Sequence, residues 1–572
     1  MPYTAPTADI RFVLDHVVGF DRVAGTERFA DATPDTVAAV LDEAGRLCTD
    51  ILAPLNRVAD QNPARLDNGV VRTAPGLADG WQAIAEGGWL GISASPESGG
   101  MGLPMALGTA LNEMLSGSCL TIHLATLLSQ GQIEALEHHA APWIRELYLP
   151  KLVSGQWNGT MNLTEPQAGS DVGALRTRAV PNGDGSYAIS GQKIYITWGD
   201  NDFTENTVHL VLARLPDAPA GTRGISLFLV PKFLPDAEGN PGARNGVRVV
   251  SLEHKLGQHG APTAVMEYTD ATGWLVGDEG AGMRCMFTMM NNARLGTGTQ
   301  GVGIAEAATQ AAFAYAEGRV QGRPLRGTSG TIQDHADVRR MLVAMRAETF
   351  AARALALDCG VAIDMGHATG DPSWTGRAGL LTPLAKSFCT DTGVWVANEA
   401  IQVHGGMGFV EETGVAQFLR DIRIGPIYEG TNGIQAMDLV GRKLSDGGEA
   451  ALRLIDEIEA GSERARVGAL ADLADTVWQA AESLRETTEA LLAEADMNVR
   501  FAGAVPYQRA FARVLGGHYH LRAALAEGGS GPRTALARAY ILRLLPEHVG
   551  LLAQVAVGDA GLYEADLADL AV

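Results

Sequence analysis

Residues 427–435 read Ile427-Tyr428-Glu429-Gly430-Thr431-Asn432-Gly433-Ile434-Gln435 and lie between two segments of helical character, 415–423 and 434–444. Gly425-Pro426 is expected to end the first helix, because Pro lacks an amide donor and restricts the residue before it. Thr431 or Asn432 can cap the second helix. Glu429 is therefore predicted on a short, fixed loop, where it is either a general base or a carboxylate favoured by a helix start.

Composition restricts the class of protein. The chain has 572 residues and a formal charge of −22, so we expect two to four domains and no nucleic-acid backbone binding. No apolar run suggests a membrane span, and the N-terminus, with Asp9 and Asp15, lacks a basic-then-apolar signal region. Five scattered cysteines without a CxxC pair indicate buried, reduced thiols in a cytoplasmic protein.

The periodicity of apolar residues changes twice along the chain. Helical periodicity dominates at both ends, and short β-branched runs separated by turn residues occupy the middle. The predicted fold is mainly α with a central β domain. The predicted domains are an N-terminal extension and helical domain (1–158), a middle β domain (159–278), a helical domain carrying the 427–435 loop (279–445) and an additional C-terminal helical domain (446–572).

Within these regions, several elements can be predicted individually. Segments 176–180 and 187–197 flank Pro181-Asn182-Gly183-Asp184-Gly185, a hairpin signal, and further strands are expected to complete a compact sheet or barrel. Those strands are predicted at 208–212, 225–230, 247–250 and 265–268. The predicted helices are 35–47, 106–115, 120–136, 334–365 and 383–404. Gly301 and Gly303 are expected to allow close helix packing, and His518 and His520 to contact solvent or a partner. No metal site is expected, since His254 and His259 lack a third ligand.

Six segments, taken together, resemble the acyl-CoA dehydrogenase flavoprotein family over about residues 36–445. In chain order they begin with Met161-Asn162-Leu163-Thr164-Glu165-Pro166-Gln167-Ala168-Gly169-Ser170-Asp171, Lys193-Ile194-Tyr195-Ile196-Thr197 and Asn291-Asn292-Ala293-Arg294. They continue with Arg319-Val320-Gln321-Gly322-Arg323, Gln402-Val403-His404-Gly405-Gly406-Met407-Gly408 and Tyr428-Glu429-Gly430-Thr431. The length, the tail after residue 446 and the Asn-Ala-Arg form further resemble the bacterial 3-methylmercaptopropionyl-CoA dehydrogenase branch.

The resemblance implies a fold of a helical N-terminal domain, a middle β-barrel domain and a four-helix C-terminal domain, with the tail as an added helical domain. It also implies FAD as cofactor and a catalytic role for Glu429. Glu429 would abstract the proton beside the thioester carbonyl while hydride leaves the next carbon for flavin N5, and its backbone N–H would donate to the thioester oxygen. Desolvation would raise the pKa of such a Glu toward neutrality.

The resemblance assigns the remaining site residues by motif position. Tyr195 would cover one ring face, and Gln402, Gly405 and Gly406 would act across a subunit boundary. The implied cofactor-binding residues are Met161, Leu163, Thr164, Gly169, Ser170, Tyr195, Ile196, Thr197, Arg319, Gln321, Gln402, Gly405, Gly406 and Thr431. The implied substrate-binding residues are Ser170, Asn291, Arg294 and Gly430.

Some positions depart from the pattern of many relatives. Met161 and Gly322 replace aromatic residues, and Asn291 stands where some relatives have Asp. The resemblance therefore gives the least support to ligand contacts at these three positions.

The function implied is FAD-dependent α,β-dehydrogenation of an acyl-CoA by a homo-oligomer, most simply a dimer, with an electron-transferring flavoprotein as acceptor. Two alternatives stay open, an acyl-CoA oxidase that uses oxygen and a DNA-associated flavoprotein of the same superfamily. The charge of −22 and the acidic tail disfavour the second. The pocket for the acyl group is expected to be lined by helices around residues 115–130. The spacing of residues does not predict which acyl group it binds.

Overall fold

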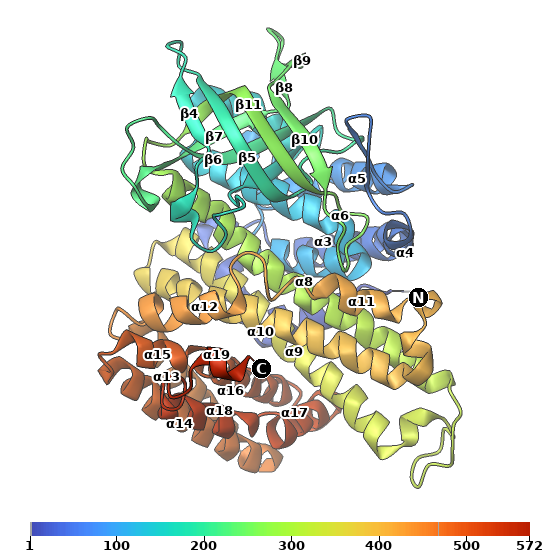
Figure 1. Ribbon diagram of the computed structural model, residues 1–572. Coiled ribbons are helices and arrows are strands. Elements are labelled where there is room, and N and C mark those ends of the chain that lie inside the picture. The colour runs from blue at the N-terminus through green and yellow to red at the C-terminus, as the bar shows by residue number, and fades with distance from the viewer. Residues whose placement is uncertain (1–2, 467, 572) are drawn as a thin grey trace.

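The computed structural model describes residues 3–466 and 468–571 (Figure 1). A β-sheet occupies one end of the molecule, and long helices fill the rest (Figure 1). The N-terminal helices lie next to the sheet, and the last helices lie at the opposite end. This arrangement confirms the predicted fold class, mainly α with a central β domain.

The N-terminal region is helical, as predicted. Thr33 accepts a hydrogen bond from the Thr36 amide at the start of α3. The predicted helices 106–115 and 120–136 form one helix, α6, which bends at Cys119 where φ is −153°. The principal elements are α1 (Thr7–His16), α3 (Pro34–Arg46), α4 (Ala53–Gln61), α5 (Leu77–Glu86), α6 (Met105–His139), α7 (Pro142–Val153) and the short hairpin β1 (Arg65–Asp67) and β2 (Val70–Arg72).

The central strands form a barrel. Pairings run from β11 to β5, β4, β6, β7 and back to β11, so five strands close a circuit, with β10 and β3 added to it. Closure leaves few free edges. The strands are β3 (Trp157–Asn162), β4 (Arg178–Pro181), β5 (Tyr187–Thr197), β6 (Asn206–Arg214), β7 (Ile225–Pro231), β10 (Val247–Leu252) and β11 (Thr263–Val276), with a small hairpin of β8 (Phe233–Pro235) and β9 (Pro241–Arg244) beside them. Strand β3 is not among the predicted strands, because its sequence, Trp157–Asn162, is rich in polar residues.

The helices after the barrel carry the 427–435 loop. They are α8 (Gly282–Gly318), α9 (Ala336–Thr369), α10 (Pro372–His404), α11 (Val415–Ile422) and α12 (Asn432–Asp438). The predicted start of α10 at residue 383 is wrong, and Pro383 lies inside the helix. The helix begins instead at Pro372, because Asp371 accepts from the Ser373 amide at 2.8 Å and Pro suits the first helical position.

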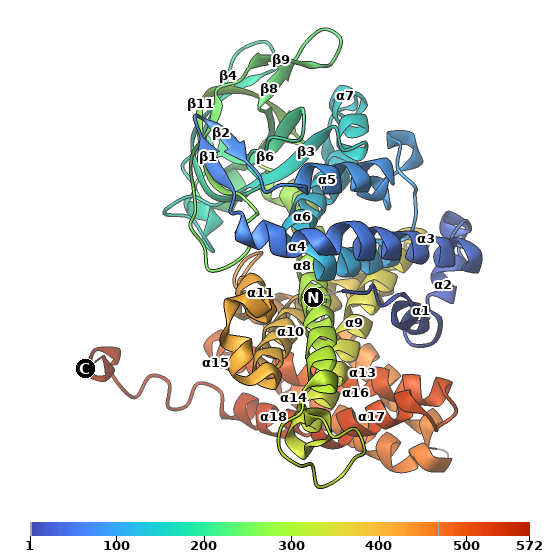
Figure 2. The same ribbon diagram turned by 90° about the vertical axis from the view of Figure 1, so that its right-hand side faces the viewer.

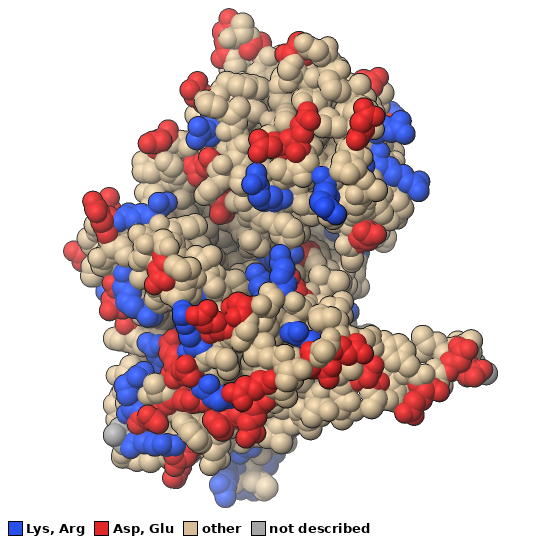
Figure 3. Space-filling view, turned by 90° about the vertical axis from the view of Figure 1, so that its left-hand side faces the viewer, with Lys and Arg blue, Asp and Glu red and all other residues tan. Residues whose placement is uncertain are grey.

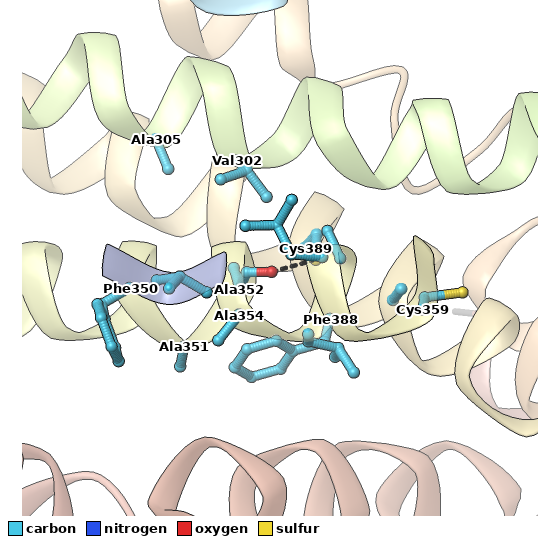
Figure 4. Packing of buried hydrophobic residues seen from close by; sticks show 14 of the residues in the cluster. Val302, Ala305, Phe350, Ala351, Ala352, Ala354, Cys359, Phe388 and Cys389 are labelled. Carbon is cyan, nitrogen blue, oxygen red and sulfur yellow. Dashed lines mark hydrogen bonds between the residues drawn. The ribbon is translucent and has the colours of Figure 1, made fainter. Parts of the chain in front are cut away.

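Small residues let α8, α9 and α10 pack closely. Figure 4 shows Val302 of α8 facing buried residues of α9 and α10, and Cys389 Sγ donates to the Ala352 carbonyl at 3.3 Å. A Cβ on Gly301 would lie 2.1 Å from the Cys389 carbonyl oxygen, and one on Gly303 would lie 2.4 Å from the Glu113 carbonyl oxygen. The predicted packing role of these glycines is confirmed.

The chain after residue 446 adds a helical layer. Its main helices are α13 (Glu449–Ala465), α14 (Ala471–Ala493), α15 (Met497–Ala502), α16 (Ala504–Ala526), α17 (Pro532–Arg543) and α18 (Glu547–Val557). Their apolar faces join the same hydrophobic core as α8 to α10. His518 and His520 are each only 1% exposed, so the prediction that they contact solvent or a partner is wrong. They lie on the face of α16 that packs against the other helices, where His520 Nε2 bonds to the Ala347 carbonyl.

One segment, Pro532–Val557, is long and apolar enough to be a membrane-span candidate. In the structure it is interrupted by Leu544-Leu545-Pro546 and forms α17 and α18, each shorter than the roughly 20 residues a span requires. The chain after α18 projects from the body and ends in the short helix α19 (Leu567–Leu570) (Figure 2). Acidic side chains lie on this projection, and acidic and basic side chains are intermixed over the lower half of the face in Figure 3.

Candidate active site

Glu429 lies on a strained turn between α11 and α12. The Gly425 amide closes the end of α11 by donating to the Ile422 carbonyl at 2.8 Å, and Thr431, not Asn432, caps α12 by accepting from the Ile434 amide at 3.2 Å. Glu429 has φ of +57°, a left-handed conformation that costs a non-glycine residue free energy, and Gly430 follows at +83°. Such strain persists only where the surroundings hold the backbone.

Side chains of α8, α10 and α12 donate hydrogen bonds to this turn. Lys386 Nζ donates to the Gly430 carbonyl and to Asn432 Oδ1, both at 2.8 Å. The Glu429 carbonyl accepts from Gln435 Nε2 at 3.1 Å and from Arg294 Nε at 3.4 Å. The backbone is therefore fixed by cations from α8 and α10, and the Glu429 carboxylate is left without a hydrogen bond from the part of the chain that the structure describes.

The environment prepares Glu429 to accept a proton near neutral pH. Burial raises the pKa of Glu429 to about 7, and the positive charges of Arg294 and Lys386 moderate the rise. Burial also lowers the pKa of Lys386 to about 8, while the neighbouring carboxylates of Glu429 and Asp391 raise it. A carboxyl group whose pKa lies near ambient pH is suited to general-base catalysis.

A buried chain of polar groups runs inward from Tyr428. The Tyr428 hydroxyl donates to Gln300 Oε1, and Gln300 Nε2 lies 3.3 Å from His123 Nδ1 on α6. Because the Gln300 amide donates, His123 Nδ1 accepts and the ring proton belongs on Nε2. That Nε2 is buried and has no hydrogen-bond partner among the described residues.

The two β-domain segments predicted to bind the flavin lie side by side. The Ile194 amide donates to the Thr164 carbonyl at 2.9 Å, and Lys193 Nζ donates to the Leu163 carbonyl at 2.9 Å. Lys193 also forms a buried ion pair with Glu165 at 2.8 Å. This internal pair anchors the 161–165 segment to the end of β5.

The side chains of these segments are available to a ligand. Tyr195 is 61% exposed and has φ of +60°, so the turn of the chain presents its ring outward. The hydroxyls of Thr164 and Thr197 are half-buried and make no hydrogen bond within the described residues. An apolar ring face beside two unused hydroxyls fits a planar heterocycle such as the flavin of FAD.

The other residues of these two segments that are predicted to bind the cofactor differ in solvent exposure. The side chains of Met161 and Leu163 are half-buried, and Gly169 and Ser170 lie on an exposed turn. Ile196 is 2% exposed, and its side chain belongs to the barrel core, so it can reach a ligand only through its backbone.

Gln258, in the loop between β10 and β11, joins the barrel to the Glu429 loop. Its amide donates to Asp421 Oδ1 at 2.5 Å, its side chain donates to the Asp421 carbonyl at 3.0 Å, and it lies beside the Tyr428 hydroxyl. Thr197 pairs with Thr263 at the start of β11. The structure therefore brings the Thr197 strand end and the Glu429 loop to one side of the molecule.

Arg294 and Asn291 both lie on α8, one helical turn apart. Arg294 is 8% exposed, and its guanidinium lies 5.6 Å from the centre of the Phe287 ring. Asn291 is exposed.

Five predicted cofactor residues lie far from this cluster, at the other end of α8. They are Arg319, Gln321, Gln402, Gly405 and Gly406. Arg319 follows Arg294 by 25 positions of a continuous helix, which corresponds to about 37 Å along its axis. His404 stacks on Tyr315 with ring centres 4.2 Å apart, so the end of α10 lies beside the end of α8. All five are exposed.

The site residues predicted from the sequence do not include Lys386, Gln258, Gln300 and His123. A lone lysine in the run Leu384-Ala385-Lys386-Ser387-Phe388 was a usable signal, because a buried lysine requires a partner. Nothing in the local sequence marks the other three, since each acts through a residue more than 100 positions away.

Protein-family models match the chain in four consecutive parts. These are the N-terminal domain of acyl-CoA dehydrogenases (34–156), the middle domain (160–271), the C-terminal domain (280–444) and the acetyl-CoA dehydrogenase C-terminal-like domain (454–566).

Curated relatives agree with the family models. The chain is 47% identical to the 3-methylmercaptopropionyl-CoA dehydrogenase of Ruegeria pomeroyi, over 89% of this chain and 88% of that protein. It is 33% identical to a butyryl-CoA dehydrogenase of Syntrophomonas wolfei, over 98% of both chains.

Solved structures share the fold over nearly the whole chain. ACDH-11 of Caenorhabditis elegans in complex with C11-CoA matches with a TM-score of 0.79 at 20% identity, covering 98% of this chain and 96% of that one. An acyl-CoA dehydrogenase of Bacillus anthracis complexed with FAD matches with a TM-score of 0.75 at 19% identity, covering 99% and 94%. Taken with the four matched domains and the relatives, these likenesses show that the chain belongs to the acyl-CoA dehydrogenase family.

Proposed function

We propose that Glu429 removes the proton beside the thioester carbonyl in the FAD-dependent dehydrogenation of an acyl-CoA, and that the acyl group is short and carries a polarisable heteroatom, as in 3-methylmercaptopropionyl-CoA. The observation that carries the first part is the carboxylate of Glu429. It receives no hydrogen bond from the described residues, has a pKa raised to about 7 by burial, and sits on a turn that α8 and α10 hold rigid.

The residues of this chain divide the chemistry between them. The Glu429 carboxylate accepts the proton, and its backbone N–H, with the permissive Gly430 beside it, is placed to donate to the thioester oxygen as charge develops there. Lys386 and Arg294 hold the loop and keep part of the Glu429 population ionised at neutral pH. Thr164, Thr197 and Tyr195 would hold FAD, which supplies the acceptor for the hydride equivalent.

The hydrogen-bonded series Tyr428–Gln300–His123 supports an acyl group that carries a heteroatom. It ends on α6, in the region expected to line the acyl group, in an Nε2–H donor that has no acceptor within residues 3–466 and 468–571. A buried unsatisfied donor costs about 1–3 kcal/mol, so a substrate atom able to accept, such as a thioether sulfur, would relieve this cost. The 47% identical relative is named for a substrate with such a sulfur.

The test compares two substrates of equal length, 3-methylmercaptopropionyl-CoA and pentanoyl-CoA, which differ by sulfur in place of one methylene. We expect kcat/KM to be about tenfold higher for the thioether, within the range that one pocket contact supplies. In His123→Leu the preference should disappear while flavin content stays unchanged. Equal kcat/KM values in the wild type, or a maximum with palmitoyl-CoA, would contradict the proposed acyl group but not the role of Glu429.

The assembly we propose is a homo-oligomer, with the dimer as its smallest form, in which each flavin contacts two chains. Arg319, at the end of α8, and Gly405, at the adjoining end of α10, are too far from Arg294 to reach the same flavin, so they would bind the flavin of the neighbouring chain. Val320, Leu325 and Phe409 expose large apolar side chains at this end, as expected of a surface that a second copy covers.

Mixed oligomers test the shared site. Arg319→Gln and Glu429→Gln should each be inactive alone, and mixed dimers should regain activity, because one of the two sites then has both residues intact. No recovery after subunit exchange would show that Arg319 and Glu429 serve the same chain's flavin.

We also propose an electron-transferring flavoprotein as the electron acceptor and the cytoplasm as the location. A dehydrogenase of this kind should be reoxidised rapidly by electron-transferring flavoprotein and slowly by oxygen after reduction by acyl-CoA. Faster reoxidation by oxygen would indicate an oxidase.

Finally, we propose domain limits near residues 158, 278 and 445. The start of the barrel at Trp157, its end at Val276 and the linker between α12 and α13 support this division.

A further inference from the structure

The face of β3 that points into the barrel is polar. Side chains alternate along a strand, so Asn158, Thr160 and Asn162 share one face. All three are 0% exposed. An apolar strand would bury this face without the free-energy cost of removing polar groups from water, so these residues require a role beyond packing.

A hydrogen-bonded series crosses the barrel interior through this face. The Tyr268 hydroxyl, on β11, donates to Asn162 Oδ1 at 2.9 Å, and Asn162 Nδ2 donates to Thr160 Oγ1 at 2.8 Å. Thr160 Oγ1 lies 2.7 Å from His209 Nδ1 on β6. Strands β11 and β3 are not neighbours in the sheet, so the bond from Tyr268 to Asn162 spans the interior. The series therefore ties three strands together from inside the barrel.

The Thr160 hydroxyl joins the two halves of this series. Burial lowers the pKa of His209 to about 3, so its ring is neutral and carries one proton. The Thr160 oxygen accepts from Asn162, and its proton is available for His209 Nδ1, which places the ring proton on Nε2. Among the described residues His209 Nε2 has no partner, so the series ends there. Removing the Thr160 hydroxyl would break two of the three bonds.

Strand β3 leads directly into the segment proposed to contact FAD. Met161 lies between the two inward-facing residues and points to the opposite side of the strand, and Thr164 follows two residues after the strand ends. Backbone bonds hold this segment within the sheet: Met161 pairs with Leu210 of β6, and the Ile194 amide donates to the Thr164 carbonyl. Those bonds lie in the plane of the sheet, whereas the interior series resists movement of the segment out of that plane.

We propose that Thr160, Asn162 and Tyr268 are positioning residues that set how closely the 161–164 segment approaches the flavin ring. This inference rests on the proposed placement of FAD against Thr164 and Tyr195. Movement of the segment toward or away from the barrel axis would change the contact of the Thr164 hydroxyl with the flavin. Hydrogen bonds to the ring tune the electronic properties of a flavin, so the series acts on the cofactor through the backbone of β3.

The first test compares Thr160→Val with Thr160→Ser in the full-length, FAD-loaded protein. Valine has nearly the shape of threonine but lacks the hydroxyl, whereas serine keeps it. We expect Thr160→Val to raise the dissociation constant of FAD about tenfold and to shift the visible absorption and circular dichroism of the bound flavin. Thr160→Ser should restore both readouts to the wild-type values.

The second test breaks the series at its other end. Tyr268→Phe removes only a hydroxyl and should shift the flavin spectrum in the same direction as Thr160→Val. The double variant should weaken FAD binding by less than the product of the two single effects, because both changes interrupt one series. Tyr187→Phe is the matched control, since the Tyr187 hydroxyl belongs to the same barrel but bonds to Glu279, at 3.4 Å.

Two outcomes would overturn the proposal, and Thr164→Val distinguishes them. If Thr164→Val alters the flavin spectrum but Thr160→Val and Tyr268→Phe lower only the melting temperature, the series is structural and the placement of FAD stands. If Thr164→Val also leaves FAD affinity and spectrum unchanged, the placement of FAD is wrong and the positioning role fails with it.

Discussion

Lys386 Nζ lies 2.8 Å from the Gly430 carbonyl oxygen, and the lysine side chain is fully buried. A buried cation on α10 therefore holds the turn that presents Glu429. Its positive charge also moderates the rise in the pKa of Glu429 that burial causes. One residue thus couples the geometry of the proposed base to its ionisation.

Replacing this cation should move the pH dependence of catalysis. In the wild type, activity should rise with pH through about 7, because only ionised Glu429 accepts a proton. Lys386→Met removes a charge that lowers the pKa of Glu429, so the midpoint of kcat/KM against pH should shift upward by about one unit. Arg423→Gln, an exposed change on the same loop, should leave the midpoint in place. An unchanged or lower midpoint in Lys386→Met would contradict the electrostatic role.

Glu429 should lower the free energy of unfolding at the pH at which it acts as a base. Its pKa is raised on folding from 4.5 to about 7, so the folded state holds the proton more tightly, and stability falls as pH rises between those values. Glu429→Gln should therefore raise the free energy of unfolding at pH 8 by about 1–3 kcal/mol and leave it nearly unchanged at pH 4.5. Denaturant titrations at both pH values check this, with exposed Glu412→Gln as control. A stabilisation that is equal at both pH values would reject the linkage.

The buried Glu165–Lys193 pair should position the flavin-facing segment. Lys193→Met leaves a buried carboxylate without its partner, which costs about 3–5 kcal/mol, and it releases the Leu163 carbonyl. The double variant Glu165→Leu/Lys193→Met should regain stability, because apolar groups replace both charges, but should still bind FAD more weakly than wild type. Full recovery of FAD affinity would show a structural role only. Arg248→Gln, which breaks an exposed pair with Glu267, should change stability by less than about 1 kcal/mol.

The close packing of α8 can be tested with two glycines of the same helix. Gly301→Ala places a Cβ 2.1 Å from the Cys389 carbonyl oxygen, a backbone atom that cannot move alone, so we expect a loss of about 1–3 kcal/mol. Gly318→Ala, at the end of the helix, meets nothing within 4 Å and should be neutral or slightly stabilising. Thermal unfolding of both variants is the measurement. A neutral Gly301→Ala would contradict the packing described.

Local patterns in the sequence are sufficient to predict many of the helices and strands of this fold. The Pro181–Gly185 turn marked its hairpin, and Gly425-Pro426 with Thr431 marked both ends of the Glu429 loop. The predicted start of α10 is wrong because Pro383 suits the first turn of a helix, although Asp371-Pro372 forms a stronger helix start. The burial of His518 was missed because a histidine on a helix carries no local sign of the face it occupies.

Only part of the candidate site can be predicted from the sequence. Motif order indicated the segments around Thr164, Thr197 and Glu429. The contacts that hold them, Lys386 to Gly430 and Gln258 to Asp421, join residues 44 and 163 positions apart, and no periodicity records such pairs. The distance between Arg294 and Arg319 followed from the unbroken length of α8, which the sequence did not reveal.

The most direct test of the account is the rate at which an acyl-CoA bleaches the flavin of Glu429→Gln in anaerobic stopped flow. We expect FAD content to match the wild type and the bleaching rate to fall by about 10²–10⁴-fold, the usual contribution of a positioned base. Glu412→Gln should bleach at the wild-type rate. Bleaching of Glu429→Gln within tenfold of the wild-type rate, with FAD fully bound, would contradict the assignment of Glu429 as the base.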